Sequence, residues 1–446
     1  MYKNKDDFGN YRPISLLPGF SKVFEIVMCA RLMEFMTECG AFSKNQHGFL
    51  ATRSTQTAIF QFTHAILRHL EEGNMALGML LDLSKAFDCL DRRMLLKKLS
   101  LYGIKGRAHD WFRSYLSNRT QRVVINKDGI DHKSEISQST VGVPQGSILG
   151  PVLFVIFMND INLEINHTNF NITQYADDTN LLVKGLNINE ISDNASNIFH
   201  LADSWFQNNK LCLNKEKTNT ILFRTKQNRT EKPEQLLINL NEFKITNSTK
   251  FLGIYIDEFL DWSTHIDYLN NKLNQICYCL RFVSKYLDES SRRILYFANF
   301  EGTARYGIIF WASNSRAQDI FVTQKRVIRI IYKLSFLESC RGVFRTKNIF
   351  TIYALYIFEL IMFVFRNREK MFVPINQNYN TRTRDIPYPI HHLTLFEKSP
   401  YYMGIKFYNK LDNDIKGITP ERKFKQKLKS FLINLEPYCL DDFMNS

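Results

Sequence analysis

The stretch Gln174-Tyr175-Ala176-Asp177-Asp178-Thr179 places two adjacent carboxylates between two apolar, β-prone runs. This pattern predicts a β-hairpin with the two aspartates at its exposed tip. Carboxylates held this close repel each other, and the arrangement is tolerable if a cation neutralises them or one takes up a proton. A metal site therefore explains the pair, although aspartates in turns more often only bond backbone groups.

A second acidic position follows a predicted central strand. Met75–Leu81 is a nearly continuous apolar run, which is typical of a buried strand, and Asp82 comes directly after it. If this strand neighbours the hairpin, Asp82, Asp177 and Asp178 converge. Three such carboxylates can hold two divalent cations about 3.5–4 Å apart, as in polymerases, nucleases and phosphatases.

Three segments together carry a family resemblance. They read LDLSKAFD at residues 81–88, VPQGSILGP at 143–151 and YADD at 175–178. In order and spacing they resemble motifs A, B and C of reverse transcriptases from jockey-type, LINE-like non-LTR retrotransposons. The resemblance implies an RNA-directed DNA polymerase that extends a DNA primer on an RNA template with dNTPs. It also implies two Mg²⁺ ions, with Mn²⁺ as a substitute, at the three aspartates.

The same resemblance assigns roles to five further residues. It places Arg53 near the incoming triphosphate, Phe87 as a steric gate against ribonucleotides, and Lys217 as the proton donor to the leaving pyrophosphate. Gln145 and Gly146 lie beside the templating base pair and the nucleotide. Three of these residues also have a purely structural interpretation. Arg53 fits a solvated loop arginine, Phe87 a core phenylalanine and Lys217 an exposed surface lysine.

The predicted fold is α+β. A strand, a helix, a hairpin, a helix and a strand follow one another between residues 76 and 223, which is the β-α-β-β-α-β order of a ferredoxin-like layout. By resemblance this is the palm of a right-hand polymerase. We expect fingers over residues 1–75, a palm with finger insertions over 76–256, a helical thumb over 257–300, and a mostly helical C-terminal region of unknown role over 301–446.

Local signals predict several helix starts. Ser21 is an N-cap candidate for a helix that buries Phe24, Val27, Met28 and Leu32. Asp91 is a plausible N-cap for the helix that follows it, so Asp88 and Asp91 are interpreted as structural. Ser147 can cap an apolar helix from Ile148 to Met158. The resemblance makes Arg12 a weaker candidate than Arg53 for contact with the triphosphate.

Beyond the palm the chemistry becomes less specific. Lys250–Tyr255 resembles the primer-grip hairpin, and apolar residues from Ile266 to Leu287 recur at spacings of three and four. A coiled coil fits that spacing, but a thumb helix against the product duplex fits its position. The basic helices predicted at 324–333 and 422–429 are either RNA-binding or merely solvated. No chemistry is assigned to Tyr379–Arg384.

Composition narrows the partners. Lys and Arg number 58 against 44 Asp and Glu, a net charge of +14, which favours nucleic acid over an anionic membrane surface. The eight cysteines include no C-x-x-C pair, so we expect neither zinc nor a disulfide framework. No oligomeric state is indicated.

The chain has neither a signal peptide pattern nor an apolar run long enough to span a bilayer. We expect an intracellular protein of the cytoplasm or the nucleus. Compared with the family, the sequence begins almost at the first finger block. It is therefore expected to be N-terminally truncated and to lack target nicking of its own.

Two rival functions stay open at this point. The first is a catalytically inactive or domesticated RNA-binding remnant, and the presence of all three aspartates argues against decay of the site. The second is a group II intron maturase, which would bring a different C-terminal region and specific intron binding.

Overall fold

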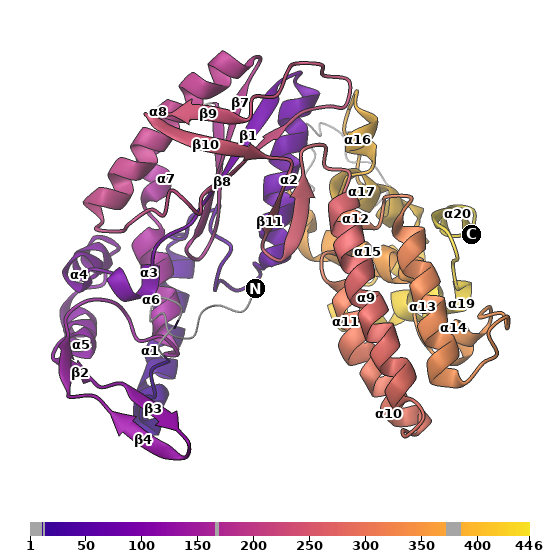
Figure 1. The fold of residues 1–446 in the computed structure, drawn as a ribbon, viewed down its shortest axis with the longest axis horizontal. Coiled ribbons are helices and arrows are strands. Elements are labelled where there is room, and N and C mark those ends of the chain that lie inside the picture. Colours follow the sequence, from indigo (N-terminus) through magenta and orange to yellow (C-terminus); the bar gives the residue numbers. More distant parts are fainter. Residues whose placement is uncertain (1–10, 12–13, 166–168, 372–384) are drawn as a thin grey trace. The chain divides into compact units, whose positions relative to one another are not determined.

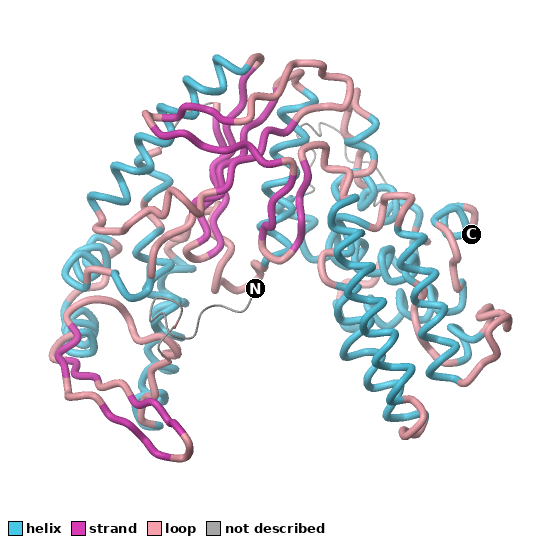
Figure 2. The backbone as a smooth tube through the Cα atoms, viewed as in Figure 1, coloured by secondary structure: helices cyan, strands magenta, loops and turns pink. Residues whose placement is uncertain are grey.

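The computed structural model describes residues 11, 14–165, 169–371 and 385–446. Arg12 and the segment 379–384 therefore lie outside the described residues. The chain forms two compact units. The first contains residues up to Phe62, Met75–Leu222 and Thr230–Thr246, and the second contains Thr63–Asn74, Phe223–Arg229 and the rest of the chain from Asn247. Most strands belong to the first unit, and the second is almost entirely helical (Figure 2).

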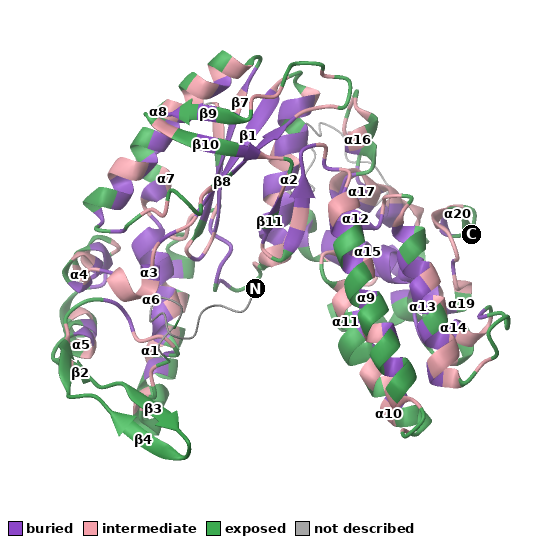
Figure 3. Cartoon of the chain, in the orientation of Figure 1, coloured by how far each residue is buried: buried purple, intermediate pink, exposed green. Residues whose placement is uncertain are grey.

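A six-stranded sheet organises the first unit (Figure 1). Its order is β6-β7-β1-β8-β10-β9, with β1 antiparallel to β7 and β6 antiparallel to β7. All seven residues of β1 are buried (Figure 3), as expected of an apolar central strand. The bounds are β1 Met75–Leu81, β6 Phe170–Tyr175, β7 Asp178–Gly185, β8 Asn219–Phe223, β9 Gln235–Ile238 and β10 Asn241–Thr246.

The first four strands in this order form the ferredoxin-like arrangement. Helix α6 (Leu149–Met158) connects β1 to the hairpin, and α8 (Ile188–Asn208) connects the hairpin to β8. Side chains of both helices share one core with the odd-numbered residues of β1, namely Met75, Leu77, Met79 and Leu81. The predicted α+β class and the β-α-β-β-α-β order are confirmed. The two strands β9 and β10 extend this sheet and were not predicted.

The remaining elements of the first unit surround that core. The hydrophobic core takes in α1 and parts of α4 and α5, whereas β3 and β4 form a two-stranded hairpin whose residues are all exposed. The bounds are α1 Gly19–Glu38, α2 Thr55–Glu71, which is shared with the second unit, α3 Ala86–Cys89, α4 Arg92–Leu101, α5 Gly106–Leu116, β2 Arg119–Gln121, β3 Val124–Lys127, β4 Ile130–Lys133, β5 Ser137–Ser139 and α7 Ile161–Glu164.

The predicted start of α1 is wrong, and its predicted buried face is only partly confirmed, since Leu32 is buried and Met28 is half-buried against the core. The helix begins at Gly19, before Ser21, and Ser21 makes no capping bond. Its buried residues are Glu25, Leu32 and Met36, whereas Phe24 and Val27 are exposed. By contrast, the predicted Asp91 cap is confirmed, since its Oδ1 accepts from the N–H groups of Arg93 and Met94.

The second unit opens with a hairpin and continues as packed helices. β11 (Ser248–Phe251) pairs antiparallel with β12 (Ile254–Asp257), which confirms the predicted hairpin at 250–255. Helix α9 (Ser263–Val283) packs on α13, and α15 packs on α17 and α19. The other bounds are α10 Glu289–Leu295, the π-helix η2 Tyr296–Glu301, α11 Gly302–Arg305, α12 Ile308–Trp311, α13 Ala317–Tyr332, α14 Val343–Thr346, α15 Ile352–Met371, α16 Thr394–Glu397, α17 Pro400–Lys410, α18 Asn413–Lys416, α19 Glu421–Leu435 and α20 Leu440–Met444.

Over the described residues, no helix combines the length and the apolar character needed to cross a bilayer.

Candidate active site

Strand pairing brings the ends of the two acidic segments together. Leu81 of β1 lies opposite Thr179 of β7, so Asp82 leaves β1 beside the start of β7, where Asp178 is the first residue. Ala176 and Asp177 form the turn between β6 and β7. The prediction that the Asp82 strand neighbours the aspartate hairpin is therefore confirmed.

Alternation along the strands decides which face the carboxylates share. Leu81 faces the helix-covered core, and the next residue, Asp82, faces the other side of the sheet. Asp178 precedes Thr179, the partner of Leu81, and therefore lies on the same side as Asp82. Asp82 and Asp177 are half-buried and Asp178 is exposed. The acidic face is thus the face that α6 and α8 leave uncovered.

Gln46 holds the turn that carries Asp177. Its Oε1 accepts from the backbone N–H of Ala176 at 2.9 Å, and its Nε2 donates to the Ala176 carbonyl at 3.4 Å. Ala176 is 4% exposed and has a φ of 56°, in the left-handed region that alanine rarely adopts. Both polar groups of this strained, buried residue therefore depend on one amide side chain.

The chain around Gln46 runs beside β6. The Gln174 N–H donates to the Asn45 carbonyl, and the His47 N–H donates to the Gln174 carbonyl, both at 2.8 Å. A Cβ on Gly48 would lie 2.4 Å from the Ala176 backbone nitrogen, so only glycine permits this approach. The segment 45–48 is therefore fastened directly to the aspartate turn.

Arg53 organises the same loop. Its Nη1 donates to the carbonyls of Ser43 and Gln46, and burial lowers the pKa of its guanidinium. The buried ring of His47 is held by Thr57 and Gln61, and burial lowers the pKa of His47 to about 4. In this structure Arg53 supports the finger loop, and a contact with triphosphate stays a prediction.

Gln145 is fixed on both sides. Its side-chain Nε2 donates to both carboxylate oxygens of Asp88, at 2.8 and 2.9 Å. Its backbone carbonyl accepts from the Ser15 N–H. Gly146 has a φ of 94°, which allows the turn that follows. Asp88 therefore has a specific structural role in this structure, since its carboxylate orients the side-chain amide of Gln145.

A buried carboxylate supports the next turn. Ser147 Oγ accepts from the Gly150 N–H, as predicted for a cap, and Glu25 accepts from the Ile148 N–H at 2.7 Å and the Leu149 N–H at 3.4 Å. Glu25 is fully buried and also accepts from the Tyr115 hydroxyl. A negative charge at this helix N-terminus is favourable.

Phe87 lies where β1 has turned back. The strand ends at Leu81, and the short helix α3 begins at Ala86. The Phe87 ring is half-buried and stacks on the buried Phe154 ring, with centroids 4.4 Å apart. One face of the ring therefore belongs to the core, and its assignment as a gate stays a prediction.

The loop that carries Lys217 lies against the Asp82 segment. The Asn214 N–H donates to the Asp82 carbonyl at 2.8 Å, and the Ser84 N–H donates to the Cys212 carbonyl at 2.9 Å. Lys217 itself is exposed, and its N–H bonds back to Asn214. Backbone bonds therefore hold the loop that carries Lys217 next to Asp82. The role of the Lys217 ammonium group as a proton donor stays a prediction.

The carboxylate oxygens at this edge are the donor type that Mg²⁺ prefers. Across the described part of the chain, no three histidine, cysteine, aspartate or glutamate side chains converge closely enough to hold an ion. The donor chemistry fits a divalent cation, whereas the side-chain arrangement as it stands does not define a metal site.

The family model described as reverse transcriptase (RNA-dependent DNA polymerase) matches residues 2–256, more than half of the chain. The chain belongs to this family. The matched segment contains every site residue discussed above, and the α+β right-hand polymerase class predicted from the sequence is confirmed with it. The predicted domain boundaries stay predictions.

Relatives of the jockey type are similar over much of the chain. The RNA-directed DNA polymerase from mobile element jockey of Drosophila melanogaster is 30% identical over 59% of this chain and 28% of the relative. The Pol polyprotein from retrotransposable element R1 of Bradysia coprophila is 27% identical over 76% of this chain and 33% of the relative. The chain thus spans about a third of the length of these relatives.

Among solved structures, a telomerase from Candida albicans with a fragment of telomeric RNA matches 71% of this chain and 57% of its own, at 12% identity and a TM-score of 0.38. A TM-score this low does not establish a shared fold.

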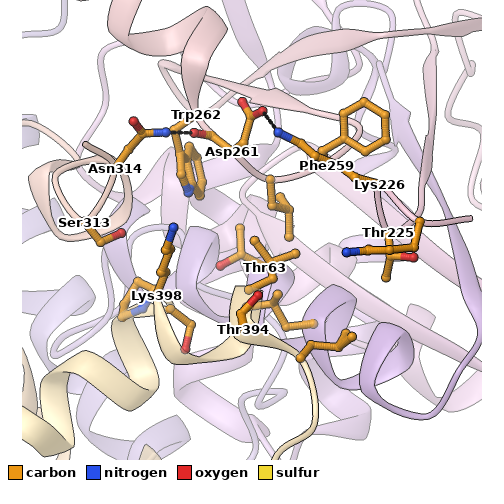
Figure 4. A pocket seen from close by; sticks show the side chains of 17 residues that line it. Thr63, Thr225, Lys226, Phe259, Asp261, Trp262, Ser313, Asn314, Thr394 and Lys398 are labelled. Carbon is orange, nitrogen blue, oxygen red and sulfur yellow. Dashed lines mark hydrogen bonds and ion pairs between the residues drawn. The ribbon is translucent and has the colours of Figure 1, made fainter. Parts of the chain in front are cut away.

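One cavity of the reverse transcriptase chain is lined by none of the site residues. It lies in the second unit, has a volume of about 220 Å³, and is lined by α2, the loop after β12 and the segment 393–400 (Figure 4). Lys226 at its rim pairs with Asp261 at 2.7 Å. Since no described lining group suggests a reaction, we assign it no function.

Proposed function

We propose that the chain is an RNA-directed DNA polymerase of a jockey-type non-LTR retrotransposon, which extends the 3′-hydroxyl of a DNA primer on an RNA template. The observation that carries this proposal is the pairing of β1 with β7. It puts Asp82 and Asp178 side by side on the same side of the sheet, at the strand ends beside the Asp177 turn, within a chain of the reverse transcriptase family.

Asp82, Asp177 and Asp178 would hold the divalent cations, two Mg²⁺ ions or Mn²⁺ in their place. Bound ions of this kind activate the attacking oxygen and neutralise charge on the leaving pyrophosphate. The protein's own contribution is to fix the three carboxylates, through the strand register and through the bonds from Gln46 to Ala176.

The other predicted residues would select and position the nucleotide. Phe87 offers a partly exposed ring edge, and an apolar ring leaves no partner for a 2′-hydroxyl. Gln145, oriented by Asp88, would contact the nascent base pair with Gly146 beneath it. Lys217 would protonate pyrophosphate, and Arg53 would bind the triphosphate or hold the loop that does.

Primer extension by the purified chain on poly(rA)/oligo(dT) with Mg²⁺ tests this proposal. We expect extension by the wild type and a loss of at least about a thousandfold in rate for Asp177→Asn, several kcal/mol of transition-state stabilisation. Binding of the primer–template should change little, because it depends on the basic surface.

Two results would contradict the proposal. Near-normal extension by Asp177→Asn would show that the Asp177 carboxylate is not needed for catalysis. A folded wild type that binds RNA but never extends a primer, with Mg²⁺ or Mn²⁺, would favour the inactive RNA-binding remnant.

A further inference from the structure

Six basic side chains gather on α13, on the loop after it and on α14. They lie in the second unit, beyond residue 256, where the family match ends. The loop between the two helices is mostly exposed (Figure 3). We call this group the basic patch; its members are Lys325, Arg326, Arg329, Lys333, Arg341 and Arg345.

Bonds within the segment show that the loop folds back along α13. The Arg329 Nε donates to the Glu338 carbonyl at 2.9 Å, and the Cys340 Sγ lies 3.6 Å from the Lys325 carbonyl. The end of the loop, at residues 338–340, therefore lies beside α13, the helix that precedes the loop. The six cations consequently occupy one continuous area rather than a string along the sequence.

Within the described residues, no member of the basic patch forms an ion pair with a carboxylate. Elsewhere in the same unit, arginine and lysine side chains are paired: Arg305 with Glu301, Arg316 with Asp267, Arg366 with Glu421 and Lys416 with Asp385.

The three acids near the basic patch have other partners. The carboxylate of Asp442 accepts from the backbone N–H groups of Tyr438 and Cys439. The carboxylate of Glu338 accepts from the backbone N–H and the hydroxyl of Ser335. The carboxylate of Glu436 accepts from the Gly342 N–H. Like charges brought this close repel one another, and a polyanion relieves that repulsion by displacing counterions.

An exposed aromatic ring stands at the tip of the loop. Phe336 is 85% exposed and its neighbour Leu337 is 89% exposed, although both are large apolar side chains. Aromatic rings beside a basic groove are the usual platform on which unpaired bases stack. Four of the six cations are arginines, whose planar fork suits phosphate better than lysine does.

We propose that the basic patch binds single-stranded nucleic acid, with phosphates on the arginines and a base on Phe336. The two exposed apolar residues make a smaller apolar surface than an interfacial membrane helix presents, which favours nucleic acid over lipid. RNA and DNA share the required chemistry. The basic patch shares no residue with the proposed polymerase site, and the proposal does not depend on polymerase activity.

The test is binding of labelled single-stranded RNA and DNA oligonucleotides to the full chain, with excess unlabelled primer–template present to occupy the polymerase site. The patch variant is Arg326→Gln/Lys333→Gln/Arg345→Gln, which removes three cations that make no described side-chain bond. We expect roughly tenfold weaker binding and a salt slope shallower by about 2, since each phosphate contact on a single strand contributes about 0.7. Comparing the two oligonucleotides distinguishes RNA from DNA.

The matched control is Lys97→Gln/Lys105→Gln/Arg107→Gln, three exposed cations on or beside α4 and α5, with the same change in net charge. Equal weakening by both triple variants would reduce the effect to overall charge and overturn the proposal. Primer extension by the patch variant verifies that this variant folds. This check is separate from the measurement of single-strand binding. If the triple variant does not fold, Phe336→Ala should still weaken single-strand binding without changing the salt slope. Unchanged affinity would overturn the proposal.

Lipid is the remaining alternative occupant. Co-sedimentation with vesicles of phosphatidylcholine and phosphatidylserine should show no dependence on the basic patch. If the patch variant loses vesicle binding but keeps single-strand binding, the basic patch is a membrane surface and the proposal fails.

Discussion

At the scale of single residues, the aspartate turn depends on a side chain far away in the sequence. Gln46 and Ala176 are 130 positions apart, and the bond joins an ordinary glutamine to a backbone group. The charge pattern singles out Asp82, Asp177 and Asp178 in the sequence, because adjacent carboxylates need an explanation, and their role as metal ligands stays a prediction. Nothing in the local pattern distinguishes Gln46 from a solvated glutamine. The positive φ of Ala176 could not be predicted either.

We expect Gln46→Leu to slow primer extension by about tenfold to hundredfold, since an unpaired buried amide costs about 1–3 kcal/mol and the turn can relax away from its catalytic position. Because Gln46 acts through the turn, the half-saturating Mg²⁺ concentration should rise while the KM for primer–template stays constant. Gln61→Leu is the control, since Gln61 bonds to His47 and Asn45 in the same segment without contacting Ala176. Equal effects of the two variants on Mg²⁺ dependence would mean that Gln46 only stabilises the fold.

Phe87→Ala separates the gate from the core interpretation. A gate variant should keep dNTP incorporation and gain rNTP incorporation by roughly tenfold to hundredfold, because the clash and the unpaired 2′-hydroxyl are relieved. Loss of the stacking on Phe154 should cost part of the about 3–5 kcal/mol typical of a buried phenylalanine. The measurement is the ratio of dNTP to rNTP efficiency in a protein with a verified melting transition. An unchanged ratio would show that Phe87 serves the core alone.

At the scale of secondary-structure elements, the β-α-β-β-α-β order was predictable, whereas strands β9 and β10 and the face of α1 were not. Apolar β1, the apolar helix α6 and the hairpin follow each other in an order with few compact solutions, which explains why the ferredoxin-like layout emerged from the sequence. For α1, hydrophobicity favoured Phe24 and Val27 as buried residues. The structure instead buries Glu25, because its carboxylate completes the N-terminus of α6.

Glu25→Ala should lower the free energy of unfolding by about 2–4 kcal/mol, since it leaves the Ile148 and Leu149 amides buried without an acceptor. Glu25→Gln keeps an acceptor and should lose less. Glu34→Ala, at an exposed position of the same helix, is the matched control. Urea unfolding followed by circular dichroism measures all three. A Glu25→Ala protein as stable as the Glu34→Ala protein would show that this bond contributes little.

At the scale of the whole molecule, three histidines with a lowered pKa link stability to pH. Burial lowers the pKa of His47, His64 and His265 to about 4 from an ordinary 6.5. Above pH 6.5 the three rings are neutral in both states. As the pH falls from 6.5 towards 4, the unfolded chain takes up protons that the folded chain cannot, so stability is lost by at most about 1.4 kcal/mol per pH unit for each histidine.

His64→Phe should make that loss shallower, because the ring sits against Tyr401 and Phe396 and a phenyl group fits the same aromatic surroundings. The free energy of unfolding measured at pH 7, 6 and 5 gives the slope. His200→Gln, at an exposed position, should leave the slope as in the wild type. A His64→Phe slope equal to the wild-type slope would rule out His64 as a source of the acid sensitivity.

The two units are interleaved along the chain, and this has a consequence for how the protein is made. The chain passes from one unit to the other five times, after Phe62, Asn74, Leu222, Arg229 and Thr246. On the ribosome, the segment Thr63–Asn74 emerges long before the helices with which it packs. Its apolar side chains stay uncovered until the residues it contacts, Phe396 and Tyr401 among them, are synthesised. A fragment that stops where the family match stops would lack these residues, so we expect it to be less soluble than the full chain.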